Sequence, residues 1–547
     1  MLDTIIKHAR IADGSGNPWY WGELGIKDGR ITHVGGTGSI DVEARHVLDA
    51  SGDVLAPGFI DGHCHSDLMI MDYPESGIKM QQGVTAEIVG NCGLAPAPFI
   101  PERADLLREY ITPVIGSTNK PWTWRSVGQF MDAIHASRPA EHMATYVAHG
   151  ALRIGVMGFE NRPPTDVEME AMKAIVREGM ESGAIGLSIG LLYAPGSYAT
   201  KHEIAELCRV VAEYGGLLST HIRGEGRHLL PSIDEVIWIA EQSGVSLHVS
   251  HLKAAGRSNW GKVLEALERI ESARARGMDV TCDVYPYHAG STTLTTVLPP
   301  WILEGGLAGV LEALKQPAIR KKLHEELAEE QEDWDNLVAS TGWHSVVISA
   351  LQTAANKMLE GKSIAEVAEL RGVHPIDAMM DLLLEESGKI TIVYYHMDNN
   401  DIEQVIRYSQ SLVASDSLHC ETGKPHPRLY GTFPRLFAKY VRERKLISLE
   451  DAVRKVSSFP AARFRLGKRG LLVPGYAADL VLFNPDTIQD QATFEDPRQY
   501  PTGISHVFVS GQWTMEHGQF RDVYAGSMLR AASSVQGCCQ HHAHSQA

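Results

Sequence analysis

Short apolar runs separated by turn residues characterise both ends of the chain. In residues 1–56 these runs alternate with turn signals such as 13–16, 27–30 and 35–36, a pattern typical of strands joined by tight turns. The same pattern returns near 473–483 and 506–511. We therefore predict one small β-sandwich domain built from both termini, residues 1–56 and 466–525.

The pattern changes between the two ends. Apolar residues three to four positions apart predict helices such as 166–182 and 232–243. Between such intervals lie eight candidate strands: 58–64, 86–90, 143–148, 185–190, 217–221, 246–251, 279–285 and 412–415. This α/β alternation predicts a (β/α)₈ TIM-like barrel over residues 57–465, with an active site at the carboxyl ends of its strands. Residues 390–395 also fit a strand, so the count stays open.

Two further segments interrupt this plan. Residues from about 290 to 390 are too many for a simple loop, and the charged helical run 320–335 indicates an insertion, with a lid as one possible role. Residues 526–547 contain a Cys- and His-rich stretch that suits metal by composition. With no apolar core around it, we predict a disordered tail.

Composition narrows the class of protein. The chain has 547 residues, 44% hydrophobic and 21% charged, as in ordinary globular enzymes. Its net charge of −17 argues against non-specific binding to nucleic acid or anionic membranes. No apolar run is long enough for a membrane span, and the first residues lack a signal-peptide pattern. Seven scattered cysteines are not a disulfide framework, so we expect a cytoplasmic protein.

Metal-capable residues recur at the predicted strand ends. His63 and His65 lie two apart, so they face the same side of a strand. Each other residue of this kind has an ordinary explanation, as a packed thiol, a hydrogen-bonded imidazole or a helix cap. Together, however, they gather at one end of one barrel and predict a metal site: Cys92, His221, His251 and Asp416, with His63 and His65.

The sequence resembles the D-aminoacylases, the N-acyl-D-amino-acid deacylases of the amidohydrolase superfamily. The resemblance extends from about residue 1 to 525, and its last two motifs are specific to that family. The matching segments are 57–65, 82–85, 90–93, 190–195, 220–226, 250–253, 285–292, 415–416 and 424–434.

The resemblance implies a metal centre. Cys92, His221 and His251 would hold one tight zinc ion, for which thiolate and imidazole ligands are suited. His63 and His65 would form a second, weaker site. Related superfamily members bridge two metals with a carboxylated lysine, and here the cysteine would replace it.

The resemblance also implies roles in catalysis and substrate binding. Asp416 would take a proton from water and pass it to the leaving amine. Tyr193 would donate to the developing oxyanion. The α-carboxylate of a small N-acyl-D-amino acid would contact Lys253, Tyr285 and Ser291.

Departures from the family pattern bear on side-chain specificity. Some members carry a basic residue just after the Ala-Gly-Ser-Thr motif, but residues 293–301 contain none. We therefore predict neutral or hydrophobic D-amino acids, with Arg223 and Arg428 as the arginines able to supply a cation from another loop.

Two alternatives stay open. One is a cyclic-amide hydrolase (dihydroorotase- or hydantoinase-like) or a deaminase on the same scaffold, and the other is a non-catalytic assembly protein. Retention of all the metal-capable residues disfavours the second. These residues leave the oligomeric state open.

Overall fold

Short parallel strands form the centre of the molecule in two sheets. The computed structural model describes residues 1–531. One sheet has the order β6 (Phe59–Asp61), β8 (Val84–Val89) and β9 (His142–Thr145). The other has the order β10 (Val147–Ala148), β11 (Gly186–Gly190), β12 (Leu217–His221), β13 (Ser246–Val249), β14 (Val280–Val284) and β18 (Ser411–Val413).

Hydrogen bonds connect the two sheets at both edges. At one edge, the Ile185 N–H, just before β11, donates to Thr145 O of β9 at 3.0 Å. At the other, β19 (Ser417–Leu418), which follows β18, pairs in parallel with β7 (Cys64–His65), which follows β6. Each of the eight predicted strands overlaps at least one of these strands; the predicted strand 143–148 is divided, because β9 pairs with β8 whereas β10 pairs with β11.

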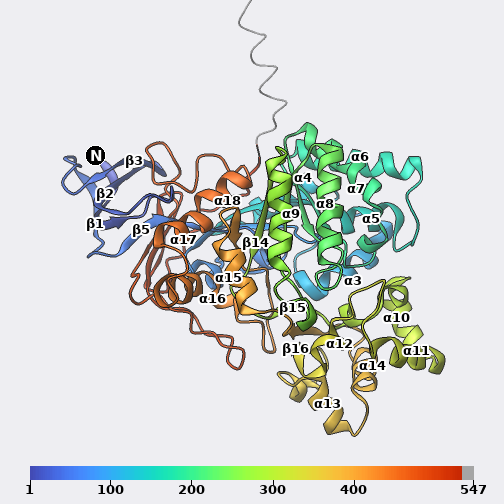
Figure 1. Cartoon of the computed structure of the whole chain (residues 1–547). Helices are drawn as coiled ribbons and strands as arrows, with labels where there is room; N and C mark the ends of the chain where they lie inside the picture. Colours follow the sequence, from blue (N-terminus) through green and yellow to red (C-terminus); the bar gives the residue numbers. More distant parts are fainter. Residues whose placement is uncertain (532–547) are drawn as a thin grey trace, which may run out of the picture.

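Helices lie outside these strands (Figure 1). The Thr165 side chain and Glu168 form a capping box that starts α6 (Asp166–Glu181), close to the predicted helix 166–182. The predicted helix 232–243 is the later part of α8 (Leu229–Ser243). The other helices of this region are α1 (Met69–Asp72), α2 (Gly77–Met80), α3 (Ala104–Ile115), α4 (Val127–Ala136), α5 (His149–Met157), α7 (Lys201–Glu213), α9 (Val263–Ala275), α15 (Asn399–Arg407), α16 (Arg428–Arg435), a π-helix (Leu436–Glu443), α17 (Leu449–Val456) and α18 (Ser458–Arg463).

The two ends of the chain share one nine-stranded sheet, at the left of Figure 1. It contains β1 (Leu2–Ile11), β2 (Tyr20–Lys27), β3 (Arg30–Gly36), β4 (Ala44–Asp49), β5 (Val54–Pro57), β20 (Leu480–Phe483), β21 (Ile504–Val509), β22 (Gln512–Glu516) and β23 (Gln519–Phe520). β5 pairs antiparallel with β20, with Leu55 opposite Leu482. Both leucines are buried in a core that also holds Ile6, Leu24 and Phe508, so apolar burial holds the two termini together.

The segment after β14 has its own sheet and core, at the lower right of Figure 1. Its antiparallel strands are β15 (Gly290–Thr293), β17 (Thr391–Tyr394) and β16 (Val346–Ala350). Its helices are α10 (Gly306–Leu314), α11 (Pro317–Leu327), α12 (Leu337–Thr341), α13 (Ile364–Arg371) and α14 (Pro375–Glu385). The predicted strand 390–395 therefore belongs to this sheet.

The charged run 320–335 is only partly helical. α11 ends at Leu327, because the Asn336 side-chain amide donates to the carbonyls of Glu326 and Glu329 and turns the chain back. The prediction of one helical run is wrong beyond this point.

The ordered chain also extends beyond residue 525. The Gly526 N–H donates to Pro139 O at 3.0 Å, and Met528 forms a β-bridge with Met143 of β9. The prediction of a disordered tail from 526 is thus wrong for residues 526–531, and the rest of it lies outside the described residues. Within residues 1–531, no helix has the length and apolar character needed to cross a bilayer.

Candidate metal centre and substrate pocket

Cys92, His221 and His251 meet in a buried group. Cys92 follows β8, His221 ends β12 and His251 follows β13. Their ligand atoms lie within 4.8 Å of one another, with Cys92 Sγ 3.7 Å from His251 Nε2. Neither ring nitrogen of His221 has a hydrogen-bond partner among the described residues, although both are buried. Buried polar atoms are rarely left unpaired, so a thiolate and two imidazoles in this arrangement fit a zinc ion.

The protonation of these residues suits a metal. Burial opposes a charge on Cys92, but the nearby His63, His221 and His251 imidazoles lower the pKa of its thiol well below the usual range. Burial lowers the pKa of His221, which keeps that ring neutral. Burial also opposes a charge on His251, yet Glu225 and Cys92 raise its pKa to about 9, so metal binding there displaces a proton.

Left-handed backbone conformations direct these side chains into one pocket. Cys92 has φ 54°, His251 has φ 34° and Asp416 has φ 48°. Such conformations in residues other than glycine carry strain and concentrate at functional sites. Three of them, each just after a parallel strand, indicate that the surrounding fold stabilises this arrangement.

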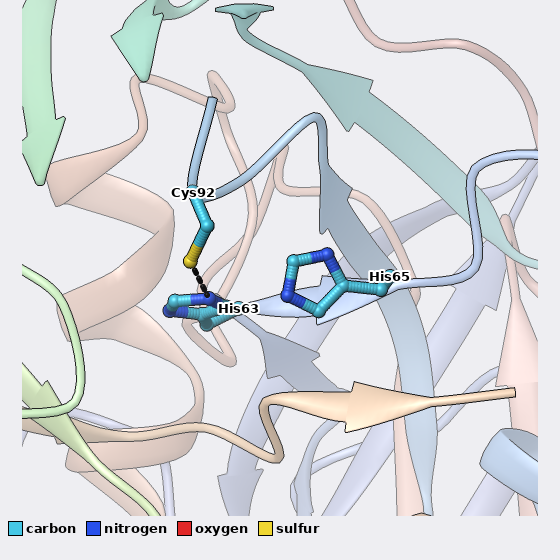
Figure 2. A group of neighbouring side chains, drawn as sticks. All are labelled: His63, His65 and Cys92. Carbon is cyan, nitrogen blue, oxygen red and sulfur yellow. Dashed lines mark hydrogen bonds between the residues drawn. The ribbon is translucent and has the colours of Figure 1, made fainter. Parts of the chain in front are cut away.

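His63 and His65 lie beside the first group, His63 in a bend between β6 and β7 and His65 in β7, so the predicted strand 58–64 is interrupted here. Cys64 Sγ points the other way, toward Ile88 O at 3.3 Å. His63 Nε2 is 3.3 Å from Cys92 Sγ (Figure 2). Asp416 Oδ1 is 3.3 Å from both His63 Nε2 and His65 Nε2. The structure therefore brings all six metal-capable residues together, and the two groups share Cys92.

Two buried carboxylates that the sequence analysis missed orient these ligands. Asp283 on β14 accepts the His251 backbone N–H at 2.7 Å and lies 3.3 Å from His63 Nδ1. Glu225 Oε1 lies 3.0 Å from His251 Nδ1. Such second partners fix the orientation of ligating imidazoles. The only sequence signals were the strand position of Asp283 and the four-residue step from His221 to Glu225.

An inner pocket of about 80 Å³ joins the metal-capable residues to the predicted substrate residues. Tyr193, Lys253, Tyr285 and Ser291 all line it. The Tyr193 ring lies 4.9 Å from the His221 ring, and burial raises the pKa of Tyr193 well above its usual range, so its hydroxyl is a donor at neutral pH.

Lys253 is already paired in this pocket. Its Nζ donates to Glu225 at 2.5 Å and lies 2.7 Å from His251 Nδ1. Burial opposes its charge, but Glu225 raises the pKa of Lys253, so the ammonium persists.

Both arginines considered as substrate cations have other partners. Arg223 does not line the inner pocket; its guanidinium pairs with Glu235 at 3.0 Å and donates to the carbonyls of Ser197 and Ala199. Arg428 Nη1 lies 2.9 Å from Asp416 Oδ2, and Nη2 donates to Ser291 O. The structure thus separates Arg223 from the other predicted substrate residues.

The segment 293–301 lies at the pocket only in part. Thr296 and Val297 line the inner pocket, and Leu298 and Trp301 line a larger cavity next to it. Leu294 is instead buried in the core of the inserted segment.

The fold and the Cys/His site define a metal-dependent hydrolase. The chain belongs to the amidohydrolase family, whose model matches residues 46–515. A D-aminoacylase from Alcaligenes xylosoxydans xylosoxydans is 35% identical over 96% of this chain and 97% of its own length. An N-acyl-D-glutamate deacylase from the same organism is 34% identical over 93% of each.

A solved structure of a related deacylase has a similar fold. The crystal structure of N-acyl-D-glutamate deacylase from Bordetella bronchiseptica, complexed with zinc and a phosphonate mimic of the tetrahedral intermediate, has a TM-score of 0.81 and 32% identity. The match covers 97% of this chain and 100% of that one.

Proposed function

We propose that this protein is a zinc-dependent deacylase that hydrolyses the amide bond of N-acyl-D-amino acids to a carboxylate and a free D-amino acid. The observation that carries the proposal is the buried group of Cys92, His221 and His251 next to Asp416, in which neither nitrogen of His221 has a hydrogen-bond partner in residues 1–531. The relatives with the same named activities support the substrate class.

Several features of the architecture belong to the proposal. The edge hydrogen bonds between the two parallel sheets support one closed (β/α)₈ barrel over 57–465. The nine-stranded sheet supports a small domain from residues 1–56 and 466–525, and the separate core near 290–390 supports an insertion. Five described cysteines are unpaired, which supports a reducing, cytoplasmic location.

The chain supplies a tight zinc site through Cys92, His221 and His251, and a weaker one through His63 and His65. Bound there, zinc supplies Lewis acidity for the amide carbonyl. Asp283 and Glu225 keep the imidazoles in place through the hydrogen bonds described above.

Asp416 moves the proton. Burial opposes its ionisation, but Arg428 and His63 hold the pKa of its carboxyl well below its usual range, so it is a carboxylate at neutral pH. It takes a proton from the attacking water and returns it to the leaving amine nitrogen. The Tyr193 hydroxyl donates to the oxyanion that develops on the carbonyl, a contact worth roughly 3 kcal/mol.

The substrate α-carboxylate lies against Lys253, Tyr285 and Ser291, which share the inner pocket with the ligands. The Lys253 ammonium compensates its charge in a site with little water.

A cyclic-amide hydrolase is the second candidate, supported by the shared scaffold. Such enzymes usually need a carboxylated lysine between two metals. Among the described residues, Lys253 pairs with Glu225, and the buried Lys79 pairs with Asp61 and Glu87 instead. A mass-spectrometric search for lysine carboxylation distinguishes the two candidates.

The decisive experiment is hydrolysis of a panel of N-acetyl D- and L-amino acids by the zinc-loaded protein. We expect turnover of D-substrates and little of their L-isomers. Hydrolysis of dihydroorotate or hydantoins in place of the D-substrates would contradict the proposal.

A further inference from the structure

A second cavity adjoins the inner pocket. Its volume is about 1270 Å³, against about 80 Å³ for the inner one. Six residues line both cavities: Leu94, Val114, Leu192, Tyr193, Thr296 and Asp335. The inner pocket therefore holds the reacting groups, while any large part of a substrate extends into the outer cavity. Common small-molecule sites measure about 300–1,000 Å³, so the outer cavity is larger than most of them.

The order of the strands indicates which part of the substrate enters it. In the six-stranded sheet, the strand that carries His221 is β12. It lies between β11 on one side and β13 and β14 on the other. Lys253 follows β13 and Tyr285 follows β14, whereas Leu192 follows β11. A substrate with its carboxylate at Lys253 and its carbonyl at His221 therefore directs its acyl group toward Leu192 and the outer cavity.

The lining of the outer cavity favours apolar groups. Large aromatic side chains contribute to it: Tyr110, Phe159, Tyr198, Trp238, Trp301 and Trp334. Six carboxylate residues, two cationic residues (Lys201 and Arg223) and His228, which pairs with Asp335, also line it. Arg223 pairs with Glu235, and the Lys201 Nζ lies over the Trp238 ring at 4.3 Å. An anionic acyl group therefore meets repulsion here without a free cation.

We propose that the outer cavity binds an apolar acyl chain of medium length, so that the preferred substrates are N-acyl-D-amino acids with chains much longer than acetyl. This inference rests on the proposed deacylase function. Val114 of α3 and Leu192 stand at the passage between the two cavities and act as specificity-determining residues for chain length.

The first test measures kcat/KM of the zinc-loaded protein for N-acetyl-, N-hexanoyl- and N-decanoyl-D-Leu, each below its micelle-forming concentration. Burial of each added CH₂ raises kcat/KM by up to about fourfold, so we expect the decanoyl substrate to exceed the acetyl one by at least about tenfold. N-succinyl-D-Leu should fall below N-butanoyl-D-Leu, which has the same carbon count without the second carboxylate.

Two outcomes separate this inference from the proposed function. Turnover of N-acetyl-D-Leu with no gain for longer chains overturns the acyl-chain assignment alone. No turnover of any N-acyl-D-amino acid overturns both. A parallel series from N-acetyl-D-Ala to N-acetyl-D-Trp tests whether the amino-acid side chain occupies the outer cavity instead. A gain in kcat/KM confined to that series also overturns the acyl-chain assignment.

Variants at the passage provide a second test. Val114→Phe narrows it and should lower the decanoyl-to-acetyl ratio of kcat/KM at least about tenfold, whereas Val114→Ala should keep the preference. Thr295→Phe, which narrows the outer cavity away from the passage, is the matched control and should change the ratio less. Zinc content and Tm identify any variant that misfolds. Equal ratios in wild type and a folded, zinc-loaded Val114→Phe contradict the inference.

Discussion

Two buried polar clusters of this protein differ in whether the chain itself satisfies them. Around Asp479, which precedes β20, every group has a partner: the His142 imidazole lies 3.2 Å away, the Ser510 N–H donates at 2.7 Å, and Arg469 forms an ion pair. On its other side, His142 Nδ1 lies 3.0 Å from Ser527 Oγ. The metal-capable cluster is equally buried, yet within the described part of the chain neither nitrogen of His221 has a hydrogen-bond partner.

This difference distinguishes a structural network from a binding site. A satisfied buried network joins β9 to the nine-stranded sheet and to residues 526–531, so its role is stability. An unsatisfied one costs free energy unless a ligand completes it. Substitutions in the two clusters should therefore affect different measurements.

Cys92→Ala should have the largest effect. Loss of the thiolate removes a primary ligand, so the protein should lose its tight zinc, about one per chain, and its turnover. Metal analysis after dialysis and an N-acyl-D-Leu assay measure both. His63→Ala is the matched control and should disturb the weaker site more than the tight one. Full zinc and full turnover in Cys92→Ala would sink the assignment of this cluster as the metal site.

Asp416→Asn should come next. The amide cannot accept the proton, so kcat should fall by about 10²-fold or more, with zinc and substrate binding retained. Single-turnover kinetics and metal analysis measure this separation. If zinc is lost while the rate per bound metal barely changes, Asp416 is a ligand and not the proton carrier.

Asp479→Asn should lower the unfolding free energy and leave catalysis unchanged. Burial opposes its charge, but His142 and Arg469 hold the pKa of Asp479 below its usual range. Its contribution is thus present above about pH 4 and is lost as the pH falls toward the folded-state pKa.

We expect the variant to lose about 2–3 kcal/mol of unfolding free energy at pH 7 and much less at acid pH. Urea unfolding at several pH values checks this, and the zinc content of the folded protein should not change. A loss of the same size at every pH would contradict a charge-based role.

The smallest expected effect concerns the substrate side chain. Near the pocket Arg428 pairs with Asp416, and Lys253, beside Glu225, is taken by the substrate α-carboxylate in the proposed binding mode. An acidic side chain would therefore be buried without a further cation. N-acetyl-D-Leu, and likewise the D-Met, D-Phe and D-Trp substrates, should exceed N-acetyl-D-Glu and N-acetyl-D-Asp by at least about tenfold in kcat/KM. Equal or better turnover of the D-Glu substrate means that a cation does reach the side chain.

Local periodicity was sufficient for much of this protein. Alternation predicted that His63 and His65 lie on the same side, and both do approach Asp416, although a bend at 62–63 interrupts the strand. The apolar runs identified the strands whose ends carry Cys92, His221 and His251. These features depend on neighbours in sequence, because the repeat of a strand or helix fixes where each side chain points. The pairing of both termini in one sheet also followed from their common strand-and-turn pattern.

Only the tertiary structure decided which distant groups pair. Arg428 pairs with Asp416, Arg223 pairs with Glu235, and Asp283 and Glu225 contact the metal-capable histidines. The long-range packing of the strands and of the inserted segment creates these contacts and the outer cavity. A charged side chain in sequence gives no sign of the partner that will satisfy it, because burial and distance arise only when separate elements pack together.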